Sequence, residues 1–61
     1  MYFYEMSVNN GVILQDAIFL DTSINNGVIT GNGFFVDSST NNGTVTGAAG
    51  FGANATDNGE V

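Results

Sequence analysis

The chain has 61 residues, among them no cysteine, histidine, lysine or arginine, and its net charge is −6. Without basic side chains it cannot displace counterions from phosphates, so neither nucleic acid nor an anionic membrane is an expected partner. A domain of this size has a thin core, and without disulfides or the usual transition-metal ligands we expect oligomerisation to supply the missing stability.

The sequence repeats along its whole length with a period of 16 residues. Phenylalanine recurs at this spacing, and so does the motif Asn-Asn-Gly, which becomes Asp-Asn-Gly in its last copy. A strict period of this kind indicates a repeat architecture. We expect one domain, residues 1–61, made of four coils at residues 1–16, 17–32, 33–48 and 49–61.

Sixteen residues are too few for a pair of helices and fit one turn of a β-solenoid. We therefore predict an all-β, single-chain β-solenoid (β-helix) with parallel, in-register sheets and uncapped ends. Each coil is expected to fold two short strands over a thin core, with a turn at Asn-Gly because this pair tolerates positive φ. The predicted core consists of Phe3, Phe19, Phe35, Phe51, Ile13, Ile29, Val45 and Val61.

Residues next to an inward phenylalanine must point outward, because side chains alternate along a strand. In the first three coils these neighbours are large and apolar, so they form two columns on one outer face. Such a patch predicts a lateral contact surface, although scattered surface apolarity is the simpler alternative. The predicted lateral face is Ile18, Leu20, Phe34 and Val36, continued by Tyr2 and Tyr4 in the first coil.

The asparagines are expected to stack, because coils of a solenoid lie about 4.8 Å apart. Amide side chains in register donate to the next carbonyl oxygen and form ladders. We read these ladders as structural rather than as a binding strip. The ladder and turn residues are Asn9, Asn10, Gly11, Asn25, Asn26, Gly27, Asn41, Asn42, Gly43, Asp57, Asn58 and Gly59.

Glu5, Asp21 and Asp37 share one column, with Ala53 in the fourth coil. Oxygen-rich acidic sites suit Ca²⁺, so this column is a weak metal candidate in a chain for which no cofactor is otherwise expected. The column lacks the glycine-rich pattern of calcium-binding β-rolls, and a solvated acidic edge is the preferred interpretation.

Enzymatic activity is not expected. The chain has no histidine, cysteine or lysine to act as base or nucleophile, and no arginine to hold an anionic substrate. A carboxylate pair that cleaves glycosides needs one acid with a raised pKa, and the sequence predicts no pocket that would raise it. We also predict neither a signal peptide nor a transmembrane segment.

The fourth coil differs from the others, with glycines at its outward positions. In a second copy stacked in register, Tyr2 would lie over Gly50 and Tyr4 over Gly52. A head-to-tail contact that does not close produces an open filament, and unblocked strand edges favour it. The predicted axial interface is Met1, Tyr2, Phe3, Tyr4, Ala49, Gly50, Phe51, Gly52, Asn58 and Val61.

The segment from Phe35 to Gly47 reads Phe-x-x-x-Ser-x-Asn-Asn-Gly-x-Val-x-Gly. It resembles sixteen-residue repeats of large bacterial and phage surface proteins, which implies a β-solenoid in a surface setting. The shorter segment Asn42–Gly47 also looks like half-repeats of the flattened ice-binding β-solenoids of grasses, for which a flat threonine face would be needed.

The leading functional hypothesis is a structural subunit that assembles with itself, head to tail, into an extracellular or surface filament, with lateral bundling as a further contact. The runner-up is a segment of a longer solenoid adhesin or phage fibre. A Ca²⁺-organised module and an ice-binding protein are weaker alternatives.

Overall fold

The computed structural model describes all 61 residues and contains strands and turns but no helix. It therefore holds no helix that is long and apolar enough to cross a membrane. In chain order the strands are β1 (Tyr2–Phe3), β2 (Val8–Asn9), β3 (Val12–Ile13), β4 (Ala17–Phe19), β5 (Ile24–Asn25), β6 (Val28–Ile29), β7 (Gly33–Phe35), β8 (Thr40–Asn41), β9 (Thr44–Val45), β10 (Ala49–Phe51) and β11 (Thr56–Asp57).

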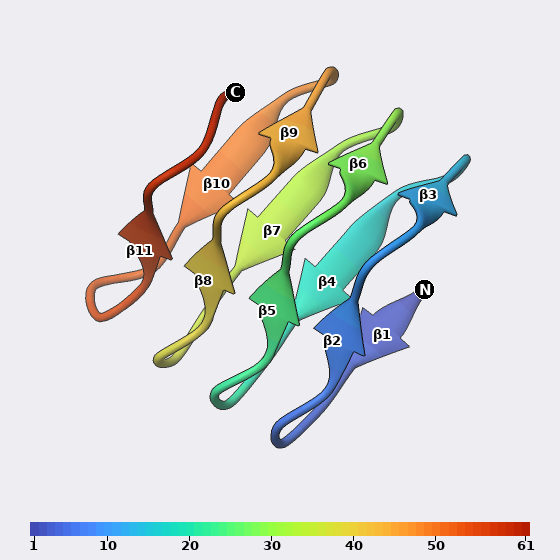
Figure 1. Ribbon diagram of the computed structural model, residues 1–61. Helices are drawn as coiled ribbons and strands as arrows, with labels where there is room; N and C mark the ends of the chain where they lie inside the picture. Colours follow the sequence, from blue (N-terminus) through green and yellow to red (C-terminus); the bar gives the residue numbers. More distant parts are fainter.

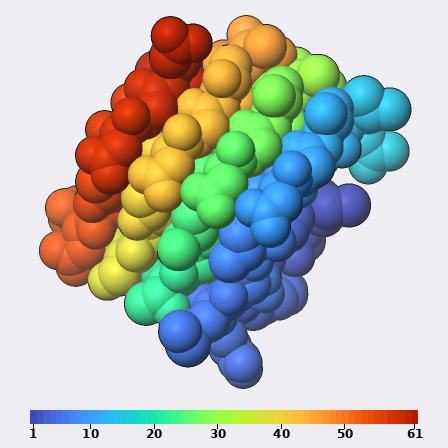
Figure 2. Space-filling view, in the orientation of Figure 1, coloured from blue at the N-terminus to red at the C-terminus, as the bar shows by residue number.

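The strands form three parallel sheets, and the predicted β-solenoid of about four coils is confirmed. Sheet A has the order β1-β4-β7-β10, sheet B the order β11-β8-β5-β2, and sheet C the order β3-β6-β9. Figure 1 shows sheets B and C side by side in front, with sheet A behind them and its strands pointing in the opposite direction. In Figure 2 the coils cross this face as parallel bands.

The expectation of two strands per coil was wrong, because the second strand is divided. Asn-Asn-Gly lies between the strands of sheets B and C and breaks the strand into two short pieces, for example β5 and β6 around Asn26-Gly27. The motif is therefore a bend in one layer of the solenoid. The reversals that join this layer to sheet A lie elsewhere in the coil.

Pairing between coils is in register at an offset of 16 residues, as in Phe3↔Phe19 and Asn25↔Asn41. Backbone hydrogen bonds join the same neighbouring coils: Ile18 N donates to Met1 O over 2.8 Å, and Asn42 N donates to Asn25 O over 2.8 Å. Every coil thus uses its neighbour to satisfy the polar groups of its backbone, as a buried main chain requires.

The apolar part of the core is a column of stacked rings beside a column of aliphatic side chains. Phe19 and Phe35 are completely buried, and the rings of successive coils lie 4.4, 4.8 and 5.0 Å apart between centroids. These separations are close to the spacing of the coils and to the lower limit of the range for favourable aromatic pairs. The buried hydrophobic residues are Ile13, Ala17, Phe19, Ile29, Phe35 and Val45.

The ends of this column are less buried than the sequence predicted. Phe3 is half-buried and packs against the core, whereas Phe51 is 37% exposed and Val61 is 64% exposed. Met1, which takes the position of the buried Ala17 in the first coil, is also exposed. Each of these side chains belongs to the first or last coil, so only one neighbouring coil covers it.

Positive φ occurs in the turns between sheets A and B and not at Asn-Gly, which corrects the sequence prediction. Glu5, Asp21 and Asp37 have φ of 57°, 58° and 57°, and no glycine has positive φ. In each turn a serine N–H donates back across three residues, as from Ser23 to Leu20 O over 3.1 Å. Aspartate tolerates this left-handed conformation better than most residues do.

The glycine of Asn-Asn-Gly is required by close approach of the coils instead. A Cβ on Gly27 would lie 1.9 Å from the carbonyl oxygen of Gly11, and a Cβ on Gly43 would lie 1.9 Å from that of Gly27. Gly59 repeats the arrangement against Gly43 at 2.0 Å. Gly11 belongs to the first coil, and a Cβ there would meet nothing closer than 4.0 Å.

This asymmetry gives a test of the stacking. Gly27→Ala should lower the free energy of unfolding by at least about 2 kcal/mol, because the coils must separate to relieve the overlap. Gly11→Ala makes the same chemical change at an open position and should alter it by no more than about 0.5 kcal/mol. Urea unfolding of both variants, followed by circular dichroism at low protein concentration, checks this. Equal destabilisation would contradict the described contact.

Candidate functional site

The interior contains a ladder of asparagine side chains, called here the inner ladder. Asn9 Nδ2 donates to Asn25 Oδ1 over 2.8 Å, Asn25 Nδ2 to Asn41 Oδ1 over 2.8 Å, and Asn41 Nδ2 to Asp57 Oδ1 over 3.1 Å. Asn25 and Asn41 are completely buried. The sequence predicted that these residues stack, but it did not predict that they form part of the core.

Each inner-ladder residue also holds the bend that follows it. Asn25 Oδ1 accepts from Gly27 N over 3.2 Å, and the equivalent bond joins Asn41 to Gly43 over 3.2 Å. The backbone donor fixes which atom of the amide is the oxygen, so the direction of the ladder is defined. No buried side-chain nitrogen or oxygen lacks a hydrogen-bond partner, as a stable polar core requires.

The second set of amides forms an exposed ladder on the surface, called here the outer ladder. Asn58 Nδ2 donates to Asn42 Oδ1 over 3.2 Å, Asn42 Nδ2 to Asn26 Oδ1 over 3.2 Å, and Asn26 Nδ2 to Asn10 Oδ1 over 3.3 Å. Its donors point toward the N-terminal coils, whereas those of the inner ladder point toward the C-terminal coils. The two ladders therefore run in opposite directions.

Serine lies beside the inner ladder as a second buried polar column. Ser23 and Ser39 are completely buried, and their hydroxyls donate to Leu20 O and Val36 O over 2.7 Å. The hydroxyls thus brace the turns and do not bond to one another. Ala55 takes this position in the fourth coil.

The acidic column braces turns too. Asp21 Oδ2 accepts from Glu5 N over 3.0 Å, and Asp37 Oδ2 accepts from Asp21 N over 3.2 Å. No three carboxylates come together in a group that could hold a metal ion. The three predicted residues are therefore placed in one column, but each aspartate serves the backbone of the preceding coil.

Thr30 and Thr46, which share one column of the repeat and would belong to a threonine face of the kind that ice binding needs, also donate to the backbone. Thr30 Oγ1 donates to Ile13 O over 3.1 Å, and Thr46 Oγ1 donates to Thr30 O over 2.7 Å. The equivalent side chain in the first coil, Leu14, is 79% exposed. The hydroxyls thus have partners within the protein, and an apolar residue interrupts the row.

The outer face of sheet A carries the predicted apolar columns. Register places Tyr2 beside Ile18 and Ile18 beside Phe34. Tyr2, Tyr4 and Phe34 are 59%, 55% and 41% exposed, whereas Ile18, Leu20 and Val36 are half-buried. These six side chains lie on one face, and the rings of Tyr2 and Tyr4 are stacked at 6.0 Å between centroids.

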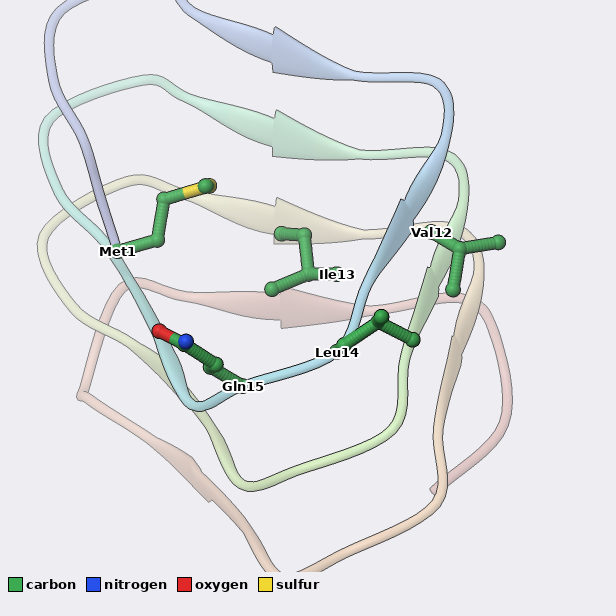
Figure 3. Close-up of a pocket in the computed structure, with 5 residues that line it drawn as sticks. All are labelled: Met1, Val12, Ile13, Leu14 and Gln15. Carbon is green, nitrogen blue, oxygen red and sulfur yellow. The ribbon is translucent and has the colours of Figure 1, made fainter.

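The first coil leaves an open apolar pocket of about 260 Å³, lined by Met1, Val12, Ile13, Leu14 and Gln15. In Figure 3, Ile13 and Met1 extend toward the space enclosed by the coil, and Val12 extends away from it. The pocket is the side of the core column that no other coil covers. In the repeat, the position over Ile13 corresponds to Val61 of the fourth coil.

The fourth coil presents the opposite side of the solenoid, with the exposed ring of Phe51 and the carboxylates of Asp57 and Glu60. The space beside Gly50, one of the outward glycines of this coil, is not fully open, however. The ring of Phe34 leans over Gly50, where a Cβ would lie 3.1 Å from Phe34 Cδ1. The space that the sequence assigned to Tyr2 of a stacked copy is therefore partly occupied within the chain.

The two ladders differ in burial, and this difference can be measured. Asn41→Ala removes the acceptor of Asn25 Nδ2 and of Gly43 N inside the protein, which should cost at least about 2 kcal/mol of unfolding free energy. Asn42→Ala, the adjacent exposed amide, should cost less than about 1 kcal/mol. Parallel urea titrations of the two variants compare them directly. A larger loss for Asn42→Ala would contradict the assignment of inner and outer ladders.

Comparison with known proteins gives no relative for this chain: no family model, curated protein or solved structure matches it.

Proposed function

We propose that this protein is a structural β-solenoid subunit whose copies stack head to tail into a filament outside the cell or on a surface. The observation that carries the proposal is the match between the first and last coils in the 16-residue register. Stacking would continue the pairing that already joins every pair of coils within the chain. It therefore needs no interface of a new kind.

The core column supports this proposal. Phe51 would stack on Phe3 of the next copy, continuing the ring separations of 4.4 to 5.0 Å seen within the chain. Val61 would lie over Ile13, in the pocket of about 260 Å³ at the first coil. Burial of these exposed side chains supplies the driving force, since each fully buried large apolar side chain contributes about 1.5–3 kcal/mol.

Backbone and outer-ladder groups are also in place for a second copy. The edge of β1 away from β4 and the edge of β10 away from β7 carry unpaired main-chain donors and acceptors, which readily take another strand. In the outer ladder, Asn10 Nδ2 of the next copy would donate to Asn58 Oδ1, as Asn58 donates to Asn42. The apolar face of sheet A would then recur in every copy along the filament, interrupted at Gly50 and Gly52, and supports lateral bundling.

The alternative is that the coils belong to a longer solenoid, such as a surface adhesin or a phage fibre, in which neighbouring coils are joined covalently. The same match in register supports it, because covalent and non-covalent continuation use identical contacts. The mass of the intact native protein distinguishes the two. A chain much longer than 61 residues favours the fibre segment.

Gly11→Ala tests the stacked arrangement without disturbing the fold. Within the chain a Cβ at this glycine is unopposed, whereas in a stack it would overlap the Gly59 carbonyl of the preceding molecule, as a Cβ on Gly27 would overlap the Gly11 carbonyl at 1.9 Å. We expect wild-type protein to form filaments at high concentration and Gly11→Ala to stay monomeric with an unchanged melting temperature. Negative-stain microscopy and sedimentation velocity provide the readout.

Ser38→Ala, an exposed change in the third coil, is the control and should assemble like wild type. Filaments of Gly11→Ala that match those of wild type would exclude this register. Monodisperse small particles of wild-type protein at high concentration would overturn the filament proposal itself.

A further inference from the structure

Asp57 is the one residue of the inner ladder that is not an asparagine. Its Oδ1 accepts from Asn41 Nδ2 over 3.1 Å and from Gly59 N over 3.1 Å. An ionised carboxylate is an acceptor only. Asp57 therefore completes the ladder on its N-terminal side and has no N–H to offer on the other.

The direction of the ladder decides what a stacked copy would meet there. Within the inner ladder, Asn25 and Asn41 each turn Oδ1 toward the preceding coil and accept the amide N–H of that coil, as Asn25 does from Asn9 over 2.8 Å. Asn9 of a stacked copy would thus turn Oδ1 toward Asp57. Two acceptors would face each other where every internal step of the ladder has a donor and an acceptor.

The contact would also be buried. Asn25 and Asn41, which have a coil on both sides, are completely buried, and a stacked copy would place Asp57 in the same environment. A buried carboxylate is strongly unfavourable when one of its oxygens faces another acceptor and receives no hydrogen bond there. No lysine, arginine or histidine exists anywhere in the chain to compensate its charge.

We propose that Asp57 is the residue that restricts axial stacking, so that the C-terminal face accepts another copy far more readily when position 57 carries an amide. This inference rests on the proposed head-to-tail stacking and names the group that regulates it. The outer ladder and the phenylalanine column favour the junction, whereas the inner ladder opposes it. Asp57→Asn converts the opposing contact into the same amide-to-amide bond that joins the internal coils.

The test compares Asp57→Asn with Asp37→Asn, which removes the same charge from an interior coil. Asparagine also tolerates the positive φ of 58° and 57° found at Asp21 and Asp37, so the control should fold. The concentration at which half of the protein sediments as filaments is measured at neutral pH. It should fall at least about tenfold for Asp57→Asn, the factor that corresponds to about 1.4 kcal/mol, and stay near the wild-type value for Asp37→Asn.

Each outcome separates the inference from the function beneath it. If Asp57→Asn forms filaments while the wild type stays monomeric, the restriction by Asp57 is supported and the filament proposal for the native chain is overturned. Equal assembly of wild type and Asp57→Asn would overturn the restriction alone. An equal gain from Asp37→Asn would assign the effect to net charge and also overturn it. Failure of every variant to assemble would overturn both.

Discussion

The hydrogen bond from one asparagine side chain to the next is the constraint on which this structure depends. Four of the 11 buried residues are polar, and buried amides are tolerated only when donors and acceptors pair completely. Asn25 meets this condition when asparagines lie above and below it, 16 residues away in each direction. A shift of one residue between coils would break the ladder and turn the phenylalanines outward. The ladder therefore specifies the register, and the apolar column supplies most of the driving force.

Much of the fold was predictable because the 16-residue repeat is regular along the whole sequence. The spacing of Phe3, Phe19 and Phe35 gave the coils, and alternation around them gave the apolar face. The conformation of the turns was not predictable in the same way. Asn-Gly is typical of positive φ, but here the glycine is needed because a neighbouring carbonyl lies where a Cβ would be, a contact between residues 16 apart. A short sequence motif predicts the conformation of its own residues, whereas the need for this glycine comes from contact with a neighbouring coil.

The sequence predicted which residues form the ladders, but it did not predict the direction in which their hydrogen bonds run. Stacked amides follow from the repeat, but their direction depends on which oxygen the bend at Gly27 uses, and only the folded coil shows this. The role of Asp57 depends on the direction of the inner ladder. In the sequence it is a small departure from Asn-Asn-Gly, and in the structure it is the acceptor at which the inner ladder ends. The same coil retains Phe51 and the outer amide Asn58, so in the proposed stack these two residues would favour the junction and Asp57 would oppose it.

In the proposed filament, copies join as coils join, and each chain contributes four successive turns to a continuous solenoid. Diffraction from aligned filaments, or power spectra of their images, tests this claim most directly. The head-to-tail filament predicts a spacing of about 4.8 Å between coils together with a subunit repeat of roughly 19 Å along the same axis. A filament that shows the 4.8 Å spacing alone, as stacked unfolded chains of a cross-β fibre do, or a subunit repeat that is not four coils long, would contradict it.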